Sequence, residues 1–91
     1  MSLEEIIEKE VGIKPFSRDG GLVYMVDRCQ YLGIFRALKK LARAYTVLKR
    51  FNRKIYKFYV GETKVLMEVA EWTVNPRKKQ PDYMVVIRVA E

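Results

Sequence analysis

The amino end of the chain has the apolar spacing of a short helix. Leu3, Ile6 and Ile7 fall on one side of such a helix, and the glutamates between them fall on the other. Ser2 stands three residues before a glutamate, which is a capping-box pattern at a helix start, and Gly12 is a typical stop. A helix is therefore expected between these two residues.

The next segment has the pattern of a hairpin. Residues 13–18 are predicted to form a short strand, which Pro15 confines to the edge of a sheet because it lacks an N–H donor. Asp19-Gly20-Gly21 is a turn signal, and residues 22–26 are rich in strand-forming side chains.

A long helical pattern follows. Asp27 and Gln30 form a cap-like pair that places a helix start near Arg28. From there to about Phe51, apolar residues recur at steps of three and four: Tyr31, Phe35, Leu38, Leu41, Ala42, Tyr45 and Leu48. The spacing predicts one amphipathic helix over 28–51.

The remainder of the chain alternates as strands do. Residues 55–60 and 65–74 flank Gly61-Glu62, a plausible tight turn. A loop over 75–81 and a last strand over 83–90 follow, the strand with apolar side chains at every second position.

These elements, in the order αββαβββ, predict an α+β fold. One domain over 1–91 is expected, with an antiparallel sheet of four to five strands packed by one short and one long helix.

Composition excludes several classes of protein. No apolar run reaches the ~18 residues that span a bilayer, and the acidic amino end is unlike a signal peptide, so a cytoplasmic protein without a membrane partner is expected. Cys29 is the single cysteine, which excludes an internal disulfide. Because histidine is also absent, neither a metal site nor a cofactor is expected.

A second bias concerns amides. There are two Asn and two Gln against many Lys, Arg, Glu, Val and Tyr residues, as described for proteins of hot environments.

Charge changes the picture most. The chain carries a net charge of +7, but residues 1–27 sum to −3 and residues 62–91 to zero. Residues 28–61 contain ten bases and no acid. Such a concentration of like charge costs self-repulsion, which an anionic ligand would relieve.

The polar side of the predicted long helix is wholly basic, with Arg36, Lys39, Lys40, Arg43 and Arg50. An exposed helix face can serve solubility alone, but such faces normally mix both signs. Contact with phosphates is the interpretation that the missing acids favour.

A cluster of aromatic and basic residues covers 50–59. Its bases are Arg50, Arg53, Lys54 and Lys57, and four aromatic residues lie among them. Single-stranded nucleic acid is bound by such mixtures, because bases stack on rings while cations follow phosphates. Aromatic residues are also ordinary strand formers. In an alternating strand Tyr56 and Phe58 share one face, and we expect Tyr59 with Lys57 to face outward.

Two further features concern ligand and subunit contacts. Arg77, Lys78 and Lys79 form a basic loop tip that can hold a nucleic-acid backbone, although charged loops often have no such role. Trp72 suits either the core or a subunit contact. Together with the free sheet edges, it favours a homodimer or higher oligomer.

Catalytic patterns are weak. Glu62-Thr63-Lys64 matches part of a metal-dependent nuclease motif but lacks its upstream Asp, and Glu68 and Glu71 fall on opposite strand faces. Gly20-Gly21 is not followed by a P-loop lysine, and Cys29 is a lone thiol. The chain is expected not to be an enzyme.

The general build resembles the ThermoDBP-type single-stranded DNA-binding proteins of thermophilic archaea. The resemblance lies in the architecture, the stretch 50–59 and the stripe of Arg36, Lys40 and Arg43. It implies an archaeal source and single-stranded DNA or RNA held in an apolar groove with basic margins, with a subunit interface as one location for this groove.

Three functions therefore compete. Binding of single-stranded nucleic acid is favoured. Docking of the basic helix on an acidic protein partner is the alternative. Peripheral membrane binding is the weakest, because the apolar side of the helix is needed for the core.

Overall fold

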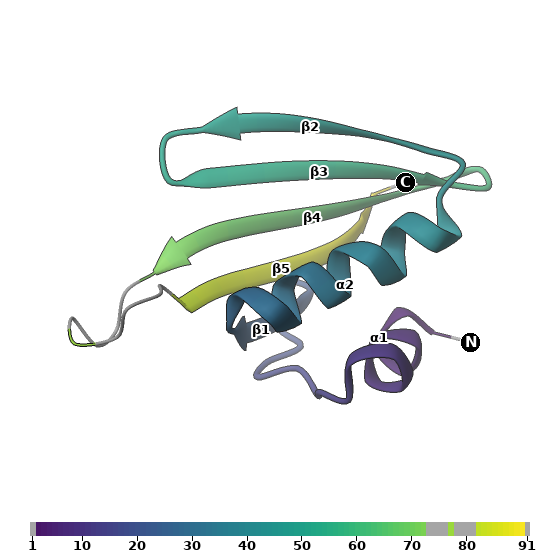
Figure 1. Cartoon of the computed structure of the whole chain (residues 1–91). Coiled ribbons are helices and arrows are strands. Elements are labelled where there is room, and N and C mark those ends of the chain that lie inside the picture. Colours follow the sequence, from purple (N-terminus) through teal and green to yellow (C-terminus); the bar gives the residue numbers. More distant parts are fainter. Residues whose placement is uncertain (1, 73–76, 78–81, 91) are drawn as a thin grey trace.

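Two helices pack on one face of a five-stranded antiparallel sheet in the residues that the computed structural model describes, which are 2–72, 77 and 82–90 (Figure 1). The strand order is β1-β5-β4-β3-β2. The predicted α+β class and the antiparallel sheet are confirmed. The elements are α1 (Leu3–Val11), β1 (Leu22–Val26), α2 (Arg28–Leu41), β2 (Ala44–Arg50), β3 (Arg53–Val60), β4 (Thr63–Trp72) and β5 (Asp82–Ala90).

Both helices begin at the predicted caps. The Glu5 N–H donates to Ser2 Oγ at 3.2 Å, and α1 ends at Gly12, which adopts a left-handed conformation. Asp27 and Gln30 form a full capping box, in which each side chain accepts a hydrogen bond from the backbone N–H of the other residue.

The prediction of one helix over 28–51 is wrong beyond Leu41. Ala42 is extended, with ψ of 140°, and β2 then pairs with β3 along its whole length. A helix continued by ten residues would have run about 15 Å further without a sheet to cover. Pairing with β3 satisfies the backbone of these residues, and β-branched Thr46 and Val47 suit a strand.

The prediction of a strand over 13–18 is also wrong. Only an isolated bridge between Ser17 and Val23 forms there, although the Phe16 N–H also donates to the Val23 carbonyl oxygen at 2.7 Å. Pro15 supplies no N–H, and the segment lies along the outer edge of β1 without joining the sheet as a strand. The observed order is therefore α1, β1, α2 and then four consecutive strands.

The carboxyl-terminal strands follow the prediction closely. Gly61 and Glu62 connect β3 to β4 in a tight turn, with Gly61 at φ 60°. The chain returns through β5, which pairs with β4 on one side and β1 on the other. Gly21 is required beside β5, because a Cβ there would lie 2.7 Å from the Ile87 carbonyl oxygen. The predicted loop over 75–81 lies outside the described residues, except for Arg77.

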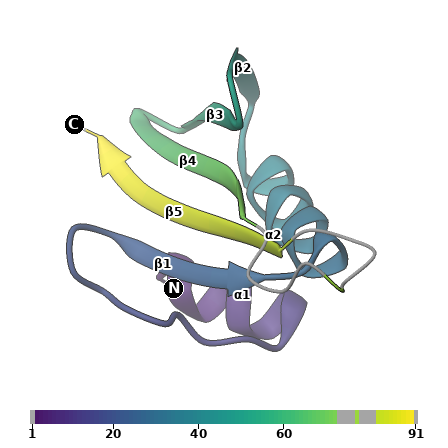
Figure 2. The same ribbon diagram turned by 90° about the vertical axis from the view of Figure 1, so that its left-hand side faces the viewer.

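The core lies between the helices and the four strands from β1 to β3 in the sheet. The side chains that α1 and α2 contribute meet alternate residues of these strands, and the buried set is Ile7, Tyr24, Val26, Tyr31, Ile34, Leu38, Tyr56, Phe58, Val65, Met67, Val69, Val85 and Ile87. In contrast, every residue of β2 is exposed. Figure 2 shows β2 at the far end of the sheet from β1 and α1. Neither helix is long and apolar enough to cross a membrane, as judged over the described residues.

Candidate functional site

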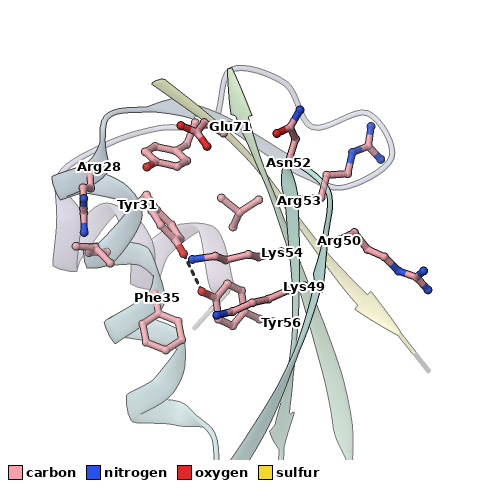
Figure 3. A pocket seen from close by; sticks show the side chains of 13 residues that line it. Arg28, Tyr31, Phe35, Lys49, Arg50, Asn52, Arg53, Lys54, Tyr56 and Glu71 are labelled. Atoms are coloured by element: carbon pink, nitrogen blue, oxygen red, sulfur yellow. Dashed lines mark hydrogen bonds between the residues drawn. The ribbon is translucent and has the colours of Figure 1, made fainter. Parts of the chain in front are cut away.

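A groove of about 470 Å³ lies between α2 and the β2–β3 hairpin, on the helix-covered side of the sheet (Figure 3). Its helix wall comes from the first two turns of α2, and its strand side comes from the end of β2, the start of β3 and the facing parts of β4 and β5. The lining residues are Arg28, Tyr31, Leu32, Phe35, Lys49, Arg50, Asn52, Arg53, Lys54, Tyr56, Val69, Glu71 and Tyr83.

Aromatic rings form the floor of the groove. The hydroxyl groups of Tyr31 and Tyr56 are hydrogen-bonded at 2.8 Å across the space between α2 and β3. Tyr31 also contacts the ring of Tyr83 at 5.0 Å between centroids, and Phe35 contacts that of Tyr56 at the same distance. Burial, reinforced by the hydrogen bond with Tyr56, raises the pKa of Tyr31 above its ordinary value.

Two lysines stand over these rings. Lys49 of β2 and Lys54 of β3 are directly opposed in the sheet, and Figure 3 shows their ammonium groups directed toward Tyr31 and Tyr56. Like charges in directly opposed positions destabilise a strand pair. Within the described part of the chain neither lysine has an ion-pair partner. The groove thus holds uncompensated positive charge beside apolar surface.

The rim of the groove is also basic. Arg28 adds a cation from the first turn of α2, and Glu71 of β4 is the single acid among the lining residues. Arg50 and Arg53 are a second directly opposed pair, but Figure 3 shows their guanidinium groups pointing away from α2. On that side the Arg53 guanidinium donates to a Glu68 carboxylate oxygen at 2.9 Å. Arg53 is therefore partly neutralised.

The predicted helical stripe of five bases is not formed as expected. Arg36, Lys39 and Lys40 lie on α2, but Arg43 lies after its end and Arg50 on β2, because the helix stops at Leu41. These helical bases also have contacts: Arg36 Nε donates to the Leu32 carbonyl oxygen at 3.3 Å, Lys40 pairs with Glu10 of α1 at 3.4 Å, and Lys39 lies 5.8 Å from the Tyr45 ring centroid. A neighbouring helix thus supplies an acid that the 28–61 segment lacks.

The predicted facing of β3 is confirmed. Tyr56 and Phe58 are buried beneath α2, whereas Lys57 and Tyr59 lie on the opposite face and are half-buried. Lys57 and Tyr59 therefore lie on the other side of the sheet from the groove. A single ligand could contact both the groove and the face with Lys57 and Tyr59 only by passing round the free edge of β2.

The remaining predicted residues are only partly described. Arg77 is exposed, whereas Lys78 and Lys79 lie outside the described residues. Trp72 is the last residue of β4, and its side chain is likewise outside the description. Contact of this loop with a ligand stays a prediction.

Most groove residues were not selected as site residues from the sequence, among them Arg28, Tyr31, Phe35, Lys49 and Tyr83. The three aromatic residues fit the apolar pattern of core residues. Tyr31 is in fact part of the core, and Phe35 and Tyr83 pack against it. Lys49 belongs to the basic segment, but a helical interpretation of 28–51 separates it from Lys54. The turn-forming residue Asn52, between the strand-like runs 45–48 and 55–60, was the sequence signal that could have indicated a hairpin.

No family model matches the chain, and the searches of curated proteins and of solved structures likewise return no match.

The groove is suited to an anionic ligand that also has a flat apolar part. Cations at its rim and over its floor attract negative charge, while Phe35 and Tyr83 add apolar surface to its lining. Among the described residues, no three Cys, Asp or Glu side chains are grouped as metal ligands. Glu68 and Glu71 fall on opposite faces of β4, as the alternation predicted.

Proposed function

We propose that this protein binds single-stranded nucleic acid in the groove between α2 and the β2–β3 hairpin, without catalysis. The observation that carries the proposal is the opposed pair of Lys49 and Lys54 above the Tyr31–Tyr56 floor. Two unneutralised lysines held side by side cost folding energy, which a bound phosphate offsets. The rings beside them suit a nucleobase.

A single strand fits this arrangement better than a duplex. The bases of a duplex are stacked inside the helix, whereas those of a single strand can turn toward aromatic side chains. Aromatic surface continues beyond the groove, since Tyr45 of β2 is 39% exposed and contacts Phe35 edge to face. The groove together with Tyr45 and Lys39 is called the trough below. The same side carries Lys39 near Tyr45, so rings and cations are interleaved along the trough.

The number of cations sets the expected salt dependence. Arg28, Lys39, Lys49 and Lys54 surround the trough. Each phosphate neutralised in a single strand contributes about −0.7 to the slope of log affinity against log salt concentration. Four contacts therefore give a slope of roughly −3.

Fluorescence anisotropy with labelled single-stranded DNA, single-stranded RNA and duplex DNA tests the proposal. We expect single strands to bind most tightly, and the double variant Lys49→Ala/Lys54→Ala to lose about tenfold or more in affinity and to have a slope shallower by about 1.4. The matched control is Lys9→Ala/Lys14→Ala, which removes the same charge from around α1 and should bind nearly as the parent does. Equal losses in both variants would mean that net charge alone acts.

The same titration separates the acidic-partner alternative. Polyglutamate offers negative charge without rings to stack on the groove floor. If polyglutamate binds as tightly as an oligonucleotide of equal charge, the groove is a general anion surface and the nucleic-acid proposal is wrong.

A further inference from the structure

The two edges of the sheet are treated differently by the chain. Along β1, the Phe16 and Ser17 backbone covers the outer edge at Val23, where the Val23 N–H donates to the Ser17 carbonyl oxygen at 2.9 Å. Along β2, all seven residues from Ala44 to Arg50 are exposed, and within the described residues no segment pairs with the outer edge. An edge of this kind can pair with another strand.

The β2–β3 turn determines which backbone groups of β2 are free. Phe51 and Asn52 form a two-residue turn that closes on the pair of Arg50 and Arg53. Successive residues of an antiparallel strand direct their N–H and C=O groups to alternate sides. Arg50 and alternate residues before it therefore face β3, whereas the backbone groups of Tyr45, Val47 and Lys49 face the free edge.

The side chains of β2 are unusually apolar for such an edge. Tyr45 is 39%, Val47 44% and Leu48 50% exposed, and these residues occupy both faces of the strand. Bases lie toward the ends of the strand, with Arg43 before it and Lys49 and Arg50 at its end. The middle of the edge has no charge to prevent pairing.

The groove itself has only one helical wall. α2 bounds it on one side, and on the other side its lining ends at β2, the last strand of the sheet, which lies past α2 in Figure 2. A ligand lying over Tyr45 and Lys49 would be open to solvent along that edge. The site is thus incomplete in a single copy of the chain.

We propose that a second copy of this chain pairs antiparallel along β2, with Val47 opposite the second copy's Val47, and so completes the groove. In this register the free backbone groups of Tyr45 meet those of the second copy's Lys49. Thr46 lies opposite Leu48, and Ala44 opposite Arg50. No base of β2 opposes another base, and each Lys49 lies beside a tyrosine ring, which favours the contact.

The pairing changes the shape of the binding surface. Because directly opposed residues share a face, the two-fold axis stands perpendicular to the sheet and both α2 helices lie on the same side. The troughs of the two copies then join into a single binding surface, with a helix along each wall and ten strands beneath. This part of the inference rests on the proposed function, and a nucleic acid lying in the trough would reduce the repulsion between two chains of charge +7.

Disulfide trapping tests the register. In a Cys29→Ser background, Val47→Cys should form a covalent dimer under mild oxidation, because directly opposed residues have Cα atoms about 5.5 Å apart. Leu48→Cys is the matched control: it lies about 7–8 Å from its own copy along the diagonal and should remain monomeric. Equal trapping of both variants, or none of Val47→Cys, would overturn the register.

Light scattering tests the pairing without any ligand. The parent is expected to be a dimer at tens of micromolar, and Val47→Pro a monomer, since proline removes only an N–H that faces the free edge. Its circular dichroism and melting midpoint show whether β2 still pairs with β3, and Val47→Lys gives a second disruption without proline. A parent that stays monomeric both with and without a 20-nucleotide single strand would overturn the proposal, as would a dimer unchanged in both variants.

Failure of the proposed function gives a different result. If the parent is a dimer and Val47→Cys traps it, but no oligonucleotide binds, then the edge pairing stands and the nucleic-acid proposal fails. If both hold, Val47→Pro should bind a 5-nucleotide strand as the parent does, but a 15-nucleotide strand at least fivefold more weakly.

Discussion

The two ends of the sheet show opposite uses of the same kind of residue. In β1, Tyr24 and Val26 are buried beneath the helices, and β5 contributes Val85 and Ile87 beside them. In β2, Tyr45 and Val47 occupy the corresponding face and remain exposed. Both strands carry apolar side chains on the helix side, but the helices bury only those of β1, and β2 adds Lys49 on the same side.

Under the proposed function, this difference separates stability from binding. The covered end has buried side chains, a chain segment over its outer edge and acids close to its bases, as in the pair of Arg18 and Glu4. The β2–β3 end has two opposed pairs of bases and exposed apolar residues. A surface that weakens the fold in this way is typical of a functional site.

The largest difference between the two ends should be in folding stability. Ile87→Ala empties a fully buried position and should destabilise the protein by about 2–5 kcal/mol. Val47→Ala on the exposed strand should cost less than about 1 kcal/mol in the monomer. Urea denaturation of both variants at low protein concentration, where dimers dissociate, gives the comparison. Similar losses would mean that β2 is as much part of the core as β5.

Stacking should distinguish the groove from the open face of the sheet. Tyr45→Ala is expected to weaken single-strand binding by about 1–3 kcal/mol with little change in the salt slope, because a stacked ring displaces no counterions. Tyr59→Ala is the matched control, since Tyr59 lies on the face without helices. If Tyr59→Ala loses affinity and Tyr45→Ala does not, the ligand binds the open face, as the sequence prediction had it. Melting midpoints must first show that both variants fold.

At the covered end, a substitution of Tyr24 should raise the folding stability, in contrast to Ile87→Ala, which should lower it. Within the described residues its buried hydroxyl has no hydrogen-bond partner, so Tyr24→Phe should stabilise the protein by about 1 kcal/mol. Burial also raises the pKa of Tyr24 to about 12, above its ordinary value near 10. Between about pH 10 and pH 12 the folded state thus keeps the Tyr24 hydroxyl proton, whereas the unfolded state loses it. The resulting stability is complete below pH 10 and is lost as the pH rises toward 12.

Denaturant midpoints at pH 7 and pH 11 check this sign. The parent should lose more stability than Tyr24→Phe between these two values. The pKa of Tyr31 is raised as well, and its loss is common to both proteins. An equal fall in both proteins would mean that Tyr24 does not contribute to alkaline unfolding.

The sequence predicted an element correctly where a single short pattern, such as a cap or a turn, determined it without a competing pattern. The capping pairs at Ser2 and Asp27 determine where the helices begin, and Gly61 determines the β3–β4 turn. The alternation in β3 likewise put Tyr56 and Tyr59 on opposite faces, and the separate expectation that Tyr59 faces outward is confirmed. Each signal involves residues close in the chain, so no knowledge of the tertiary structure was needed.

The second half of the predicted long helix could not be settled in this way. Tyr45 and Leu48 continue the helical spacing of α2, but Tyr45 and Val47 equally fit a strand. The pairing of β2 with β3, a tertiary effect, decides between them. The groove depends on that pairing, since only the hairpin brings Lys49 opposite Lys54 and both beside Tyr31. The sequence therefore could not predict where the groove lies, although it did predict a basic and aromatic surface.

The smallest expected change in stability bears most directly on the difference between the two ends. Lys49→Glu replaces an opposed pair of like charges with an opposite pair, so the protein should become more stable by about 0.2–1 kcal/mol. The same change places a carboxylate over the groove floor and should weaken single-strand binding at least tenfold. Lys64→Glu on the open face is the control, because Lys64 lies opposite Tyr59 and not opposite a base. Thermal melts and anisotropy on the same samples measure both quantities. A gain in stability with a loss of binding is expected only where like charges are retained for a ligand. If Lys49→Glu loses both, the lysine supports the hairpin itself, and the positive charge of the groove has a structural role.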